Sequence, residues 1–258
     1  MPSEIFMLFS SSKGNCCLVR NGSEAFLIDA GVSAKRIEAA LSAVGTNPSS
    51  LRAVFLTHEH SDHIAGLNQL CKRYGLPVYA PPGCMEPLSA LCPDAVPFLC
   101  PFTPGTVVNL ERSRVYAVAT PHDAAGSVGF RMDLSGELFG YFTDIGYLTT
   151  SILKALSGCH RVVIESNHDV GMLRSGPYPE PLKRRILGEY GHLSNASCAS
   201  LLPHLPTYGT KRILLAHLSE QNNTPEIAYE ESASRLKEAL SAGTVTLSVA
   251  SPADPVEL

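Results

Sequence analysis

A dense group of metal-ligand residue types lies in the segment Thr57–His63, which reads THEHSDH. Neutral imidazole and carboxylate groups are the side chains that bind zinc and similar divalent ions. His58 and His60 can chelate one ion, and the adjacent Asp62 and His63 can point toward a second. Three histidines within six residues are improbable in an ordinary polar surface loop. The segment therefore predicts a metal site.

A second pattern recurs at four other places, where an apolar strand ends in a ligand-type residue. These residues are Asp29 after Ala25–Ile28, His122 after Val115–Thr120, Asp144 after Leu138–Thr143 and His217 after Ile213–Ala216. In a layered sheet protein, strand ends at one edge converge on one site. Each position alone is ordinary, but together with the histidine-rich segment they indicate one centre at a sheet edge.

The elements that must position these residues alternate between strands and helices. Cys16–Arg20 and Ala25–Asp29 are predicted to form a hairpin around Asn21-Gly22. Helical spacing marks Ser33–Val44 and also Ile64–Tyr74, which ends before Gly75. The other predicted strands are Ala53–Thr57, Val78–Ala80, Val107–Leu110, Arg114–Thr120, Ser127–Asp133, Leu138–Thr143, Val162–Glu165, Ile213–Ala216 and Val245–Ala250. The other predicted helices are Ser151–Leu156, Pro181–Tyr190, Ala196–Leu202 and Pro225–Leu240. This alternation predicts a layered α/β or α+β domain, with the proline-rich stretch Pro77–Pro104 as a packed connector within it.

Composition narrows the class of protein. The 258 residues are 45% hydrophobic and 17% charged, which excludes a disordered chain. A net charge of −4 excludes a globally basic nucleic-acid binder but leaves room for a local basic groove. No apolar run approaches the roughly 18 residues that span a bilayer, and the N-terminal segment lacks signal-peptide features. We therefore expect no membrane association and a cytoplasmic location.

The eight cysteines do not indicate disulfides or a zinc ribbon, because their spacing is irregular and no C-x-x-C pair occurs. Cys16, Cys17, Cys71 and Cys198 lie in apolar stretches, so we expect them to be small buried hydrophobic residues.

Between Asp29 and His217 these motifs resemble the metallo-β-lactamase superfamily. The resemblance implies a four-layer αββα sandwich, with residues 1–258 forming one hydrolase domain, and two divalent ions at one edge. The residue types suit zinc and manganese, and also iron. By position, the resemblance assigns His58, His60 and His122 to the first ion, Asp62, His63 and His217 to the second, Asp144 as the bridge, and Asp29 as a support behind the ligands.

Further segments are similar to the YycJ/WalJ (VicX) group of bacterial proteins, which is related to the nuclease branch containing RNase Z and RNase J. These segments are Ser10–Asn15, Glu165–Leu173, Gly191–Asn195 and Ala216–Asn223. The resemblance implies phosphodiester hydrolysis, with nucleic acid as the partner, and more finely a 5′ to 3′ DNA exonuclease. The interval between Asp144 and His217 is too short for the β-CASP domain that RNase J inserts there.

The implied catalytic residues are Asp62, Glu165 and His192. Two ions bridged by Asp144 would lower the pKa of a shared water and supply hydroxide. His192, oriented by Glu165, would protonate the leaving 3′ oxygen. Alternatively, His192 caps a helix, since Ser194 and Asn195 are N-cap residue types.

Several other residues are candidates for supporting or substrate-binding roles. His168, beside Asp169, either supports the site or contacts substrate, or is simply structural. Ser12, Lys13 and Asn15 lie in a loop whose backbone N–H groups can cradle a phosphate. Arg184 and Arg185 either track a phosphate backbone or form an ordinary solvated helix face.

Two other functions remain open at this point. A small-molecule hydrolase of the thioesterase or lactonase type would share every metal ligand, although the Glu165 and His192 segments favour a nuclease. A non-catalytic scaffold would be expected to lose ligands, whereas all seven positions are filled here.

Overall fold

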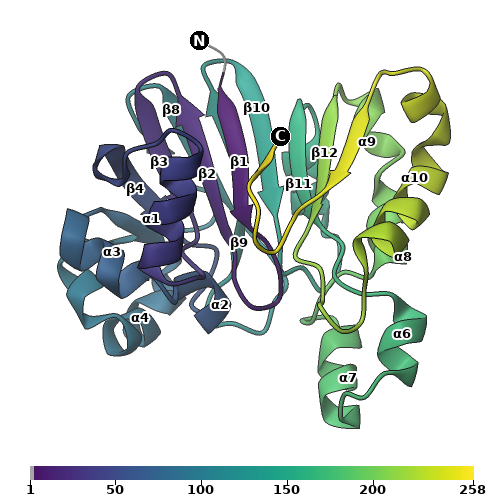
Figure 1. Ribbon diagram of the computed structural model, residues 1–258, viewed down its shortest axis with the longest axis horizontal. Helices are drawn as coiled ribbons and strands as arrows, with labels where there is room; N and C mark the ends of the chain where they lie inside the picture. The colour runs from purple at the N-terminus through teal and green to yellow at the C-terminus, as the bar shows by residue number, and fades with distance from the viewer. Residues whose placement is uncertain (1–2) are drawn as a thin grey trace.

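The computed structural model describes residues 3–258 and contains two seven-stranded sheets in this range (Figure 1). Both sheets combine antiparallel strands with parallel ones. The first sheet has the spatial order β14 (Val256–Glu257), β1 (Glu4–Phe9), β2 (Cys16–Asn21), β3 (Glu24–Ile28), β4 (Leu51–Phe55), β5 (Val78–Ala80) and β6 (Leu99–Pro101). The second has the order β13 (Thr246–Val249), β12 (Arg212–Ala216), β11 (Arg161–Glu165), β10 (Glu137–Phe142), β9 (Val128–Leu134), β8 (Ser113–Ala119) and β7 (Val107–Asn109).

Helices accompany each sheet, and none of the described helices is long and apolar enough to cross a membrane. Those that follow strands of the first sheet are α1 (Ala34–Ala43), α2 (Ser61–Ile64), α3 (Leu67–Tyr74) and α4 (Met85–Leu91). Those of the second half are α5 (Thr150–Leu156), α6 (Val170–Ser175), α7 (Glu180–Leu187), α8 (Asn195–Leu201), α9 (His204–Thr207) and α10 (Pro225–Ser241).

Three hydrophobic clusters hold these layers together. One joins the first sheet to α1 and α3, and another joins the second sheet to α5, α8 and α10. The third lies between the sheets, where the rings of Phe55 and Phe130 meet at a centroid distance of 6.0 Å. All eight cysteines are free, and the four that the sequence assigned to the interior are buried. The predicted four-layer αββα sandwich is therefore confirmed.

The directions of the strands explain why the predicted site residues lie at one edge of the sandwich. In the first sheet β3 and β4 are parallel, and in the second β10, β11 and β12 are parallel. β8 runs in the same direction as β10, because each pairs antiparallel with β9. The carboxyl ends of these strands therefore meet at one edge of the sandwich, as the sequence pattern predicted.

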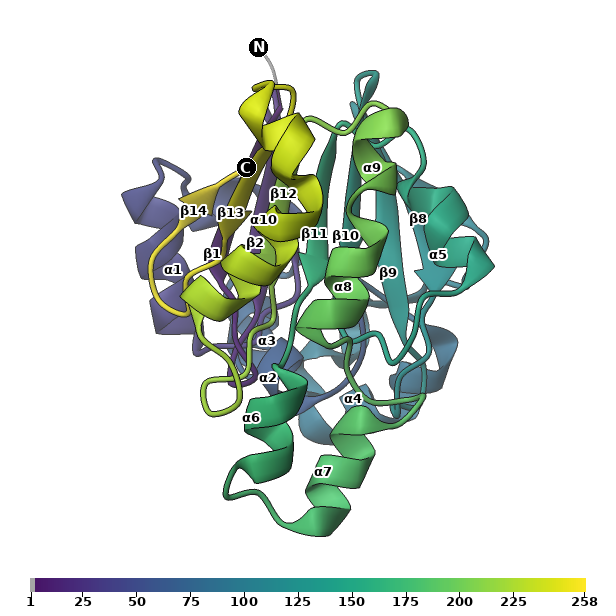
Figure 2. The same cartoon turned by 90° about the vertical axis from the view of Figure 1, so that its right-hand side faces the viewer.

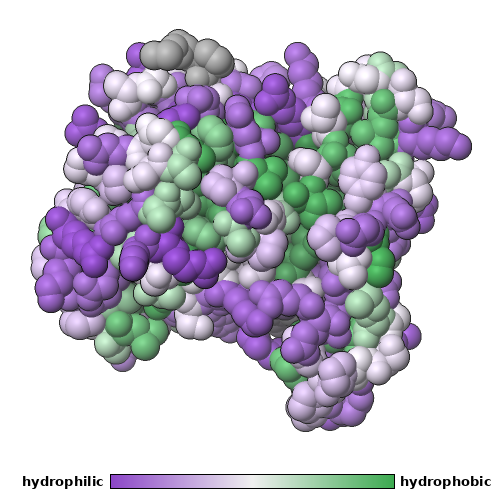
Figure 3. All heavy atoms as spheres, viewed as in Figure 1, coloured by the Kyte–Doolittle hydropathy of each residue, from purple (hydrophilic) through white to green (hydrophobic). Residues whose placement is uncertain are grey.

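A helical projection extends from this edge. Figures 1 and 2 show α6 and α7 standing out from the body as a pair, joined by a short loop. Figure 3 shows hydrophilic and hydrophobic residues mixed on the projection, with a notch in the outline between it and the helices of the first half. The predicted helix Pro181–Tyr190 forms part of it but ends at Leu187, before Gly188.

Two other sequence predictions need correction. The helix predicted over Ile64–Tyr74 begins only at Leu67, because a break at Gly66 separates α2 from α3. A Cβ atom on Gly66 would lie 2.3 Å from the carbonyl oxygen of Val32, so the chain needs glycine at this crossing. The segment Pro77–Pro104 is not only a connector, because it contains β5, α4 and β6.

Candidate metal centre

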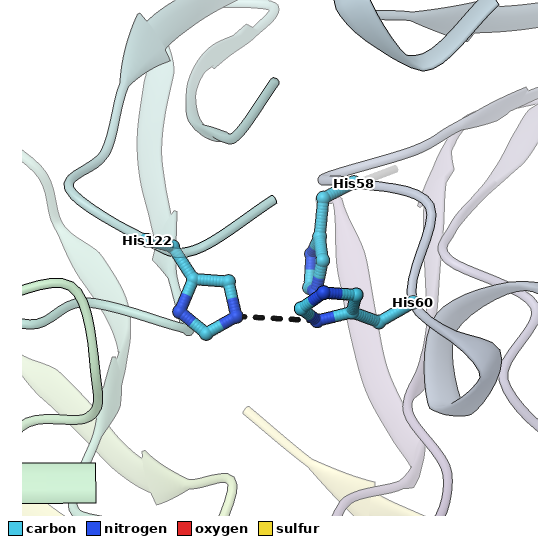
Figure 4. Close-up of side chains that lie close together, drawn as sticks. All are labelled: His58, His60 and His122. Atoms are coloured by element: carbon cyan, nitrogen blue, oxygen red, sulfur yellow. Dashed lines mark hydrogen bonds between the residues drawn. The ribbon is translucent and has the colours of Figure 1, made fainter. Parts of the chain in front are cut away.

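Three imidazoles from the two sheets converge at the shared edge (Figure 4). His58 and His60 follow β4, and His122 follows β8. Nε2 of His122 lies 3.3 Å from Nδ1 of His60, and the ring centres of His58 and His60 are 4.5 Å apart. One ring nitrogen from each residue lies within 4.8 Å of the others, so the three can share one ion.

A second group lies beside the first and contains Asp62, His63 and His217. Oδ2 of Asp62 is 3.3 Å from Nε2 of His63 and 3.5 Å from Nε2 of His217. Asp144 lies between the two groups, with Oδ2 3.4 Å from His63 Nε2 and Oδ1 3.7 Å from His122 Nε2. The structure thus brings together all seven predicted ligands, and their binding of ions stays a prediction.

The backbone is bent where three site residues leave their strands. Asp29, Asp144 and His217 have φ angles of 60°, 56° and 58°, in the left-handed region that only a few per cent of non-glycine residues adopt. Such strained conformations cluster at functional sites, where the surrounding structure enforces them. Here the bend follows β3, β10 and β12, so that three side chains lie at the edge instead of continuing along the sheets.

Asp29 is fully buried and lies behind the histidine-rich segment. It accepts hydrogen bonds from the backbone N–H and the hydroxyl of Thr57, and its Oδ2 accepts one from Nδ1 of His63 at 2.8 Å. A carboxylate on Nδ1 fixes the ring so that Nε2 faces the centre. This contact places Asp29 where the resemblance implies a support for the ligands, and that role stays a prediction.

Glu165 has a wider role than the sequence suggested. Its Oε1 accepts hydrogen bonds from Nδ1 of His192 and from Nδ1 of His217, both at 2.8 Å. Its Oε2 accepts from the backbone N–H groups of Ile145 and Leu193. One buried carboxylate therefore orients a predicted metal ligand as well as the predicted proton donor.

The donor set fits a bound metal. Among the described residues, the buried atoms His58 Nε2, His217 Nε2 and Asp144 Oδ2 have no hydrogen-bond partner. Leaving such atoms unpaired in the interior is costly, unless an ion or water satisfies them. Burial and the neighbouring histidines hold the pKa of His58 well below its usual range, which keeps this ring neutral and able to bind a metal.

His192 lies at the lip of the centre with 17% of its side chain exposed. Since Nδ1 is held by Glu165, Nε2 is the nitrogen left to face a substrate atom. The alternative that His192 caps the next helix is wrong, because the Ser194 side chain caps α8 by accepting from the N–H of Ser197.

A cavity of about 260 Å³ opens beside the centre. Of the predicted substrate-binding residues, Ser12, Lys13 and Arg185 line it. Lys13 forms an ion pair with Glu220. Arg185 donates hydrogen bonds from Nε and Nη2 to the carboxylate of Asp123.

Two other predicted substrate contacts lie elsewhere. Asn15 is fully buried, and its amide nitrogen donates to Ser11 O and lies 3.4 Å from Oδ2 of Asp62, so it braces a predicted ligand. Arg184 is exposed and is not among the described residues that line the cavity, although its neighbour Arg185 is. Adjacent helical residues point to different sides, which explains why only one of the pair is turned inward.

His168 is buried beside the centre, with Nδ1 3.3 Å from Oδ1 of Asn167. The carboxylate of the neighbouring Asp169 caps α6 by accepting from the N–H of Met172. Burial lowers the pKa of His168 to about 4, so this ring is neutral at physiological pH. A supporting role for His168 stays a prediction.

Comparison with known proteins agrees with this geometry. A family model described as a beta-lactamase superfamily domain matches residues 24–218. The chain belongs to the beta-lactamase superfamily. The chain is 38% identical to the exodeoxyribonuclease YycJ of Bacillus anthracis, and the alignment covers 86% of this chain and 84% of the relative. It is 34% identical to the exodeoxyribonuclease WalJ of Streptococcus pneumoniae, covering 90% and 88%.

A solved structure shows the same fold at a greater distance. The metallo-beta-lactamase fold protein YhfI from Bacillus subtilis superposes over 100% of both chains with a TM-score of 0.73, at 18% identity. The family match and the two relatives, not this likeness, identify the chain as a metal-dependent hydrolase.

Some residues of the site carried no signal in the sequence. Tyr178, Leu182 and Ile186 of the projection line the cavity. Nothing in their types or spacing indicates chemistry. Asn167 and Ser219 also line the cavity, and the only clue to them was their place within the segments Glu165–Leu173 and Ala216–Asn223.

Proposed function

We propose that this chain is a nuclease that hydrolyses phosphodiester bonds with two divalent ions, and more finely a DNA exonuclease that acts from 5′ ends in the cytoplasm. One observation carries the proposal, namely that Glu165 holds His192 by Nδ1 at 2.8 Å at the lip of the cavity. The names of the two relatives described above support DNA as the substrate.

We assign the ions to two sets of side chains. His58, His60 and His122 would hold one ion, Asp62, His63 and His217 would hold the other, and Asp144 would contact both. When bound, the ions supply a water of lowered pKa and stabilise negative charge on a phosphate oxygen. Both zinc and manganese suit these nitrogen and oxygen ligands.

The residues of the chain then do three things. Lys13 and Arg185 attract the phosphate backbone and position it in the cavity. His192 donates a proton from Nε2 to the leaving 3′ oxygen, a role typically worth about 10²–10⁴-fold in rate. Glu165 accepts from Nδ1 of His192, and this hydrogen bond orients the ring so that Nε2 faces the leaving oxygen.

Leaving-group dependence tests the role of His192. The variant His192→Ala should keep its metal but lose most turnover on DNA, because the leaving oxygen receives no proton. A p-nitrophenyl phosphodiester should be spared, since its phenolate leaves unaided. Loss of metal, or equal slowing of both substrates, would contradict the proposed role.

Substrate class and polarity need a second assay. Metal-loaded protein is incubated with duplex and single-stranded DNA and RNA labelled at either end, with Mn²⁺ or Zn²⁺. We expect mononucleotides released from the 5′ end of DNA. Turnover of thioesters or lactones with DNA left intact would instead support the small-molecule hydrolase.

A further inference from the structure

We propose that the helical projection supplies a stacking subsite for one unpaired terminal nucleotide, so that the enzyme accepts a frayed or single-stranded end and is tolerant of base identity. This inference rests on the proposed nuclease function and goes beyond it, because it says which part of the substrate the projection contacts. The subsite comprises Tyr178, Leu182 and Ile186.

The first support is the chemistry of the cavity wall. Tyr178 lies in the loop between α6 and α7, and Leu182 and Ile186 lie one turn apart on α7. These three side chains line the same cavity as Asp62, Asp144 and His192. A half-buried aromatic ring with two aliphatic neighbours is a surface on which a base can stack, since every base has an apolar face.

The second support is the placement of positive charge. Lys13, from the loop after β1, and Arg185, from α7, line the cavity together with the apolar residues. In the structure each cation is paired with one carboxylate, Glu220 and Asp123 respectively. A nucleotide joins a base to an anionic phosphate, so it matches a cavity that combines an apolar wall, cations and a metal centre.

The size of the cavity limits what can enter. Its volume of about 260 Å³ lies at or below the small end of ligand sites, which commonly span about 300–1,000 Å³. This size suits a single nucleotide better than a base pair. On this proposal a paired terminus opens before its base stacks on Tyr178, at a cost in energy that an unpaired end avoids.

The two aliphatic side chains of the wall and the Asn167 amide beside them offer little means of reading a base. Both polar atoms of the Asn167 side chain have partners, since its nitrogen donates to His217 O and its oxygen lies 3.3 Å from Nδ1 of His168. Leu182 and Ile186 have no hydrogen-bonding side-chain atoms. Recognition by stacking alone gives only modest preference among the four bases.

The test compares tyrosine variants of the full-length, metal-loaded protein. Tyr178→Ala should raise KM on single-stranded DNA about tenfold or more, the scale of losing one base–aromatic stack, with a smaller change in kcat. Tyr178→Phe should restore KM, because the ring is kept. Tyr208→Ala is the matched control, since Tyr208 is an exposed tyrosine on another face that lines a different cavity.

A binding measurement gives an independent readout. A short oligonucleotide carries 2-aminopurine at its 5′ terminus and a phosphorothioate at the terminal linkage, which slows cleavage. Stacking on Tyr178 should change the fluorescence of this probe on binding to the wild type and to Tyr178→Phe, but not on binding to Tyr178→Ala. End structure is compared in parallel, and an unpaired terminal nucleotide should be removed faster than a blunt G·C-paired one.

The outcomes separate the two proposals. If the wild type releases no nucleotides from any end, the proposed nuclease function is wrong. If it releases nucleotides but Tyr178→Ala behaves like Tyr208→Ala, or blunt and unpaired ends react equally, the stacking subsite is wrong and the nuclease function stands.

Discussion

The two halves of the candidate centre are each organised by a buried carboxylate, and the two carboxylates differ in what they hold. Asp29, after β3 in the first sheet, binds Thr57 and one imidazole, His63. Glu165, at the end of β11 in the second sheet, binds two backbone N–H groups and two imidazoles. The first carboxylate therefore contacts one predicted metal ligand, whereas the second contacts a predicted metal ligand and the proposed proton donor.

The pKa values of the two carboxyl groups also differ, because the neighbouring histidines act more strongly on Glu165 than on Asp29. Burial raises the pKa of Asp29, and His63 and Thr57 offset only part of that effect. Burial acts in the same way on Glu165, but the adjacent His192 and His217 outweigh it and hold the pKa of this carboxyl below its usual range. The comparison indicates that the second half is where ligand geometry and proton transfer are coupled.

The largest expected effect is the loss of metal, which should disable both halves together. Treatment with a chelator, or His60→Ala, should abolish turnover without unfolding the chain, because the ligands follow strand ends and lie outside the three hydrophobic clusters. Metal analysis should find two ions per chain in the wild type. His204→Ala is the control, since that histidine is exposed on α9. A stoichiometry below one in well-folded, fully loaded protein would refute the two-ion assignment.

The next largest effect should come from Glu165→Gln. An amide cannot accept from donors on both of its atoms, so at least two of the four N–H donors lose their partner. We expect turnover on DNA to fall by about 10²–10⁴-fold, as for a lost proton donor. The free energy of unfolding should also fall by about 2–4 kcal/mol, measured by chemical denaturation. Normal activity in this variant would show that the coupling is not functional.

A smaller effect, confined mainly to metal affinity, is expected for Asp29→Asn. The amide can still accept from Thr57 but loses the charged contact with His63, so metal affinity should fall by about 10–100-fold. Excess metal should then restore most turnover, since His192 keeps its partner. Competition with a fluorescent chelator measures the affinity. If excess metal rescues Glu165→Gln equally well, the two halves do not differ as we infer.

The smallest expected effect concerns Arg185, which lines the cavity beside the second half of the centre. Arg185→Glu should weaken DNA binding and reduce the slope of log K against log salt by about 1 or more, because fewer counterions are released. Arg184→Glu, one residue away and outside the cavity lining, should change the slope less. Binding is measured by fluorescence anisotropy at several salt concentrations. Equal slopes for the two variants would indicate that DNA does not bind along the cavity.

Much of the site was predictable because its signals are local. The THEHSDH segment places four predicted ligand residues after β4 and at the start of α2, and Asp29, His122, Asp144 and His217 each follow a strand closely. Parallel strands end at a common edge, so these positions had to meet. The same local reasoning failed at Gly66, where a crossing with Val32 breaks the predicted helix.

The sequence by itself determined the residue types of the centre, the strands that carry them and the layered fold, because hydrophobic periodicity and ligand spacing act over short distances. Only the tertiary structure decided that Glu165 holds two histidines, that Asn15 braces Asp62 instead of facing substrate, and that Tyr178 enters the cavity. Each of these depends on side chains from segments far apart in the chain. Their contacts are set by how the two sheets and the projection pack against one another, which no local pattern encodes.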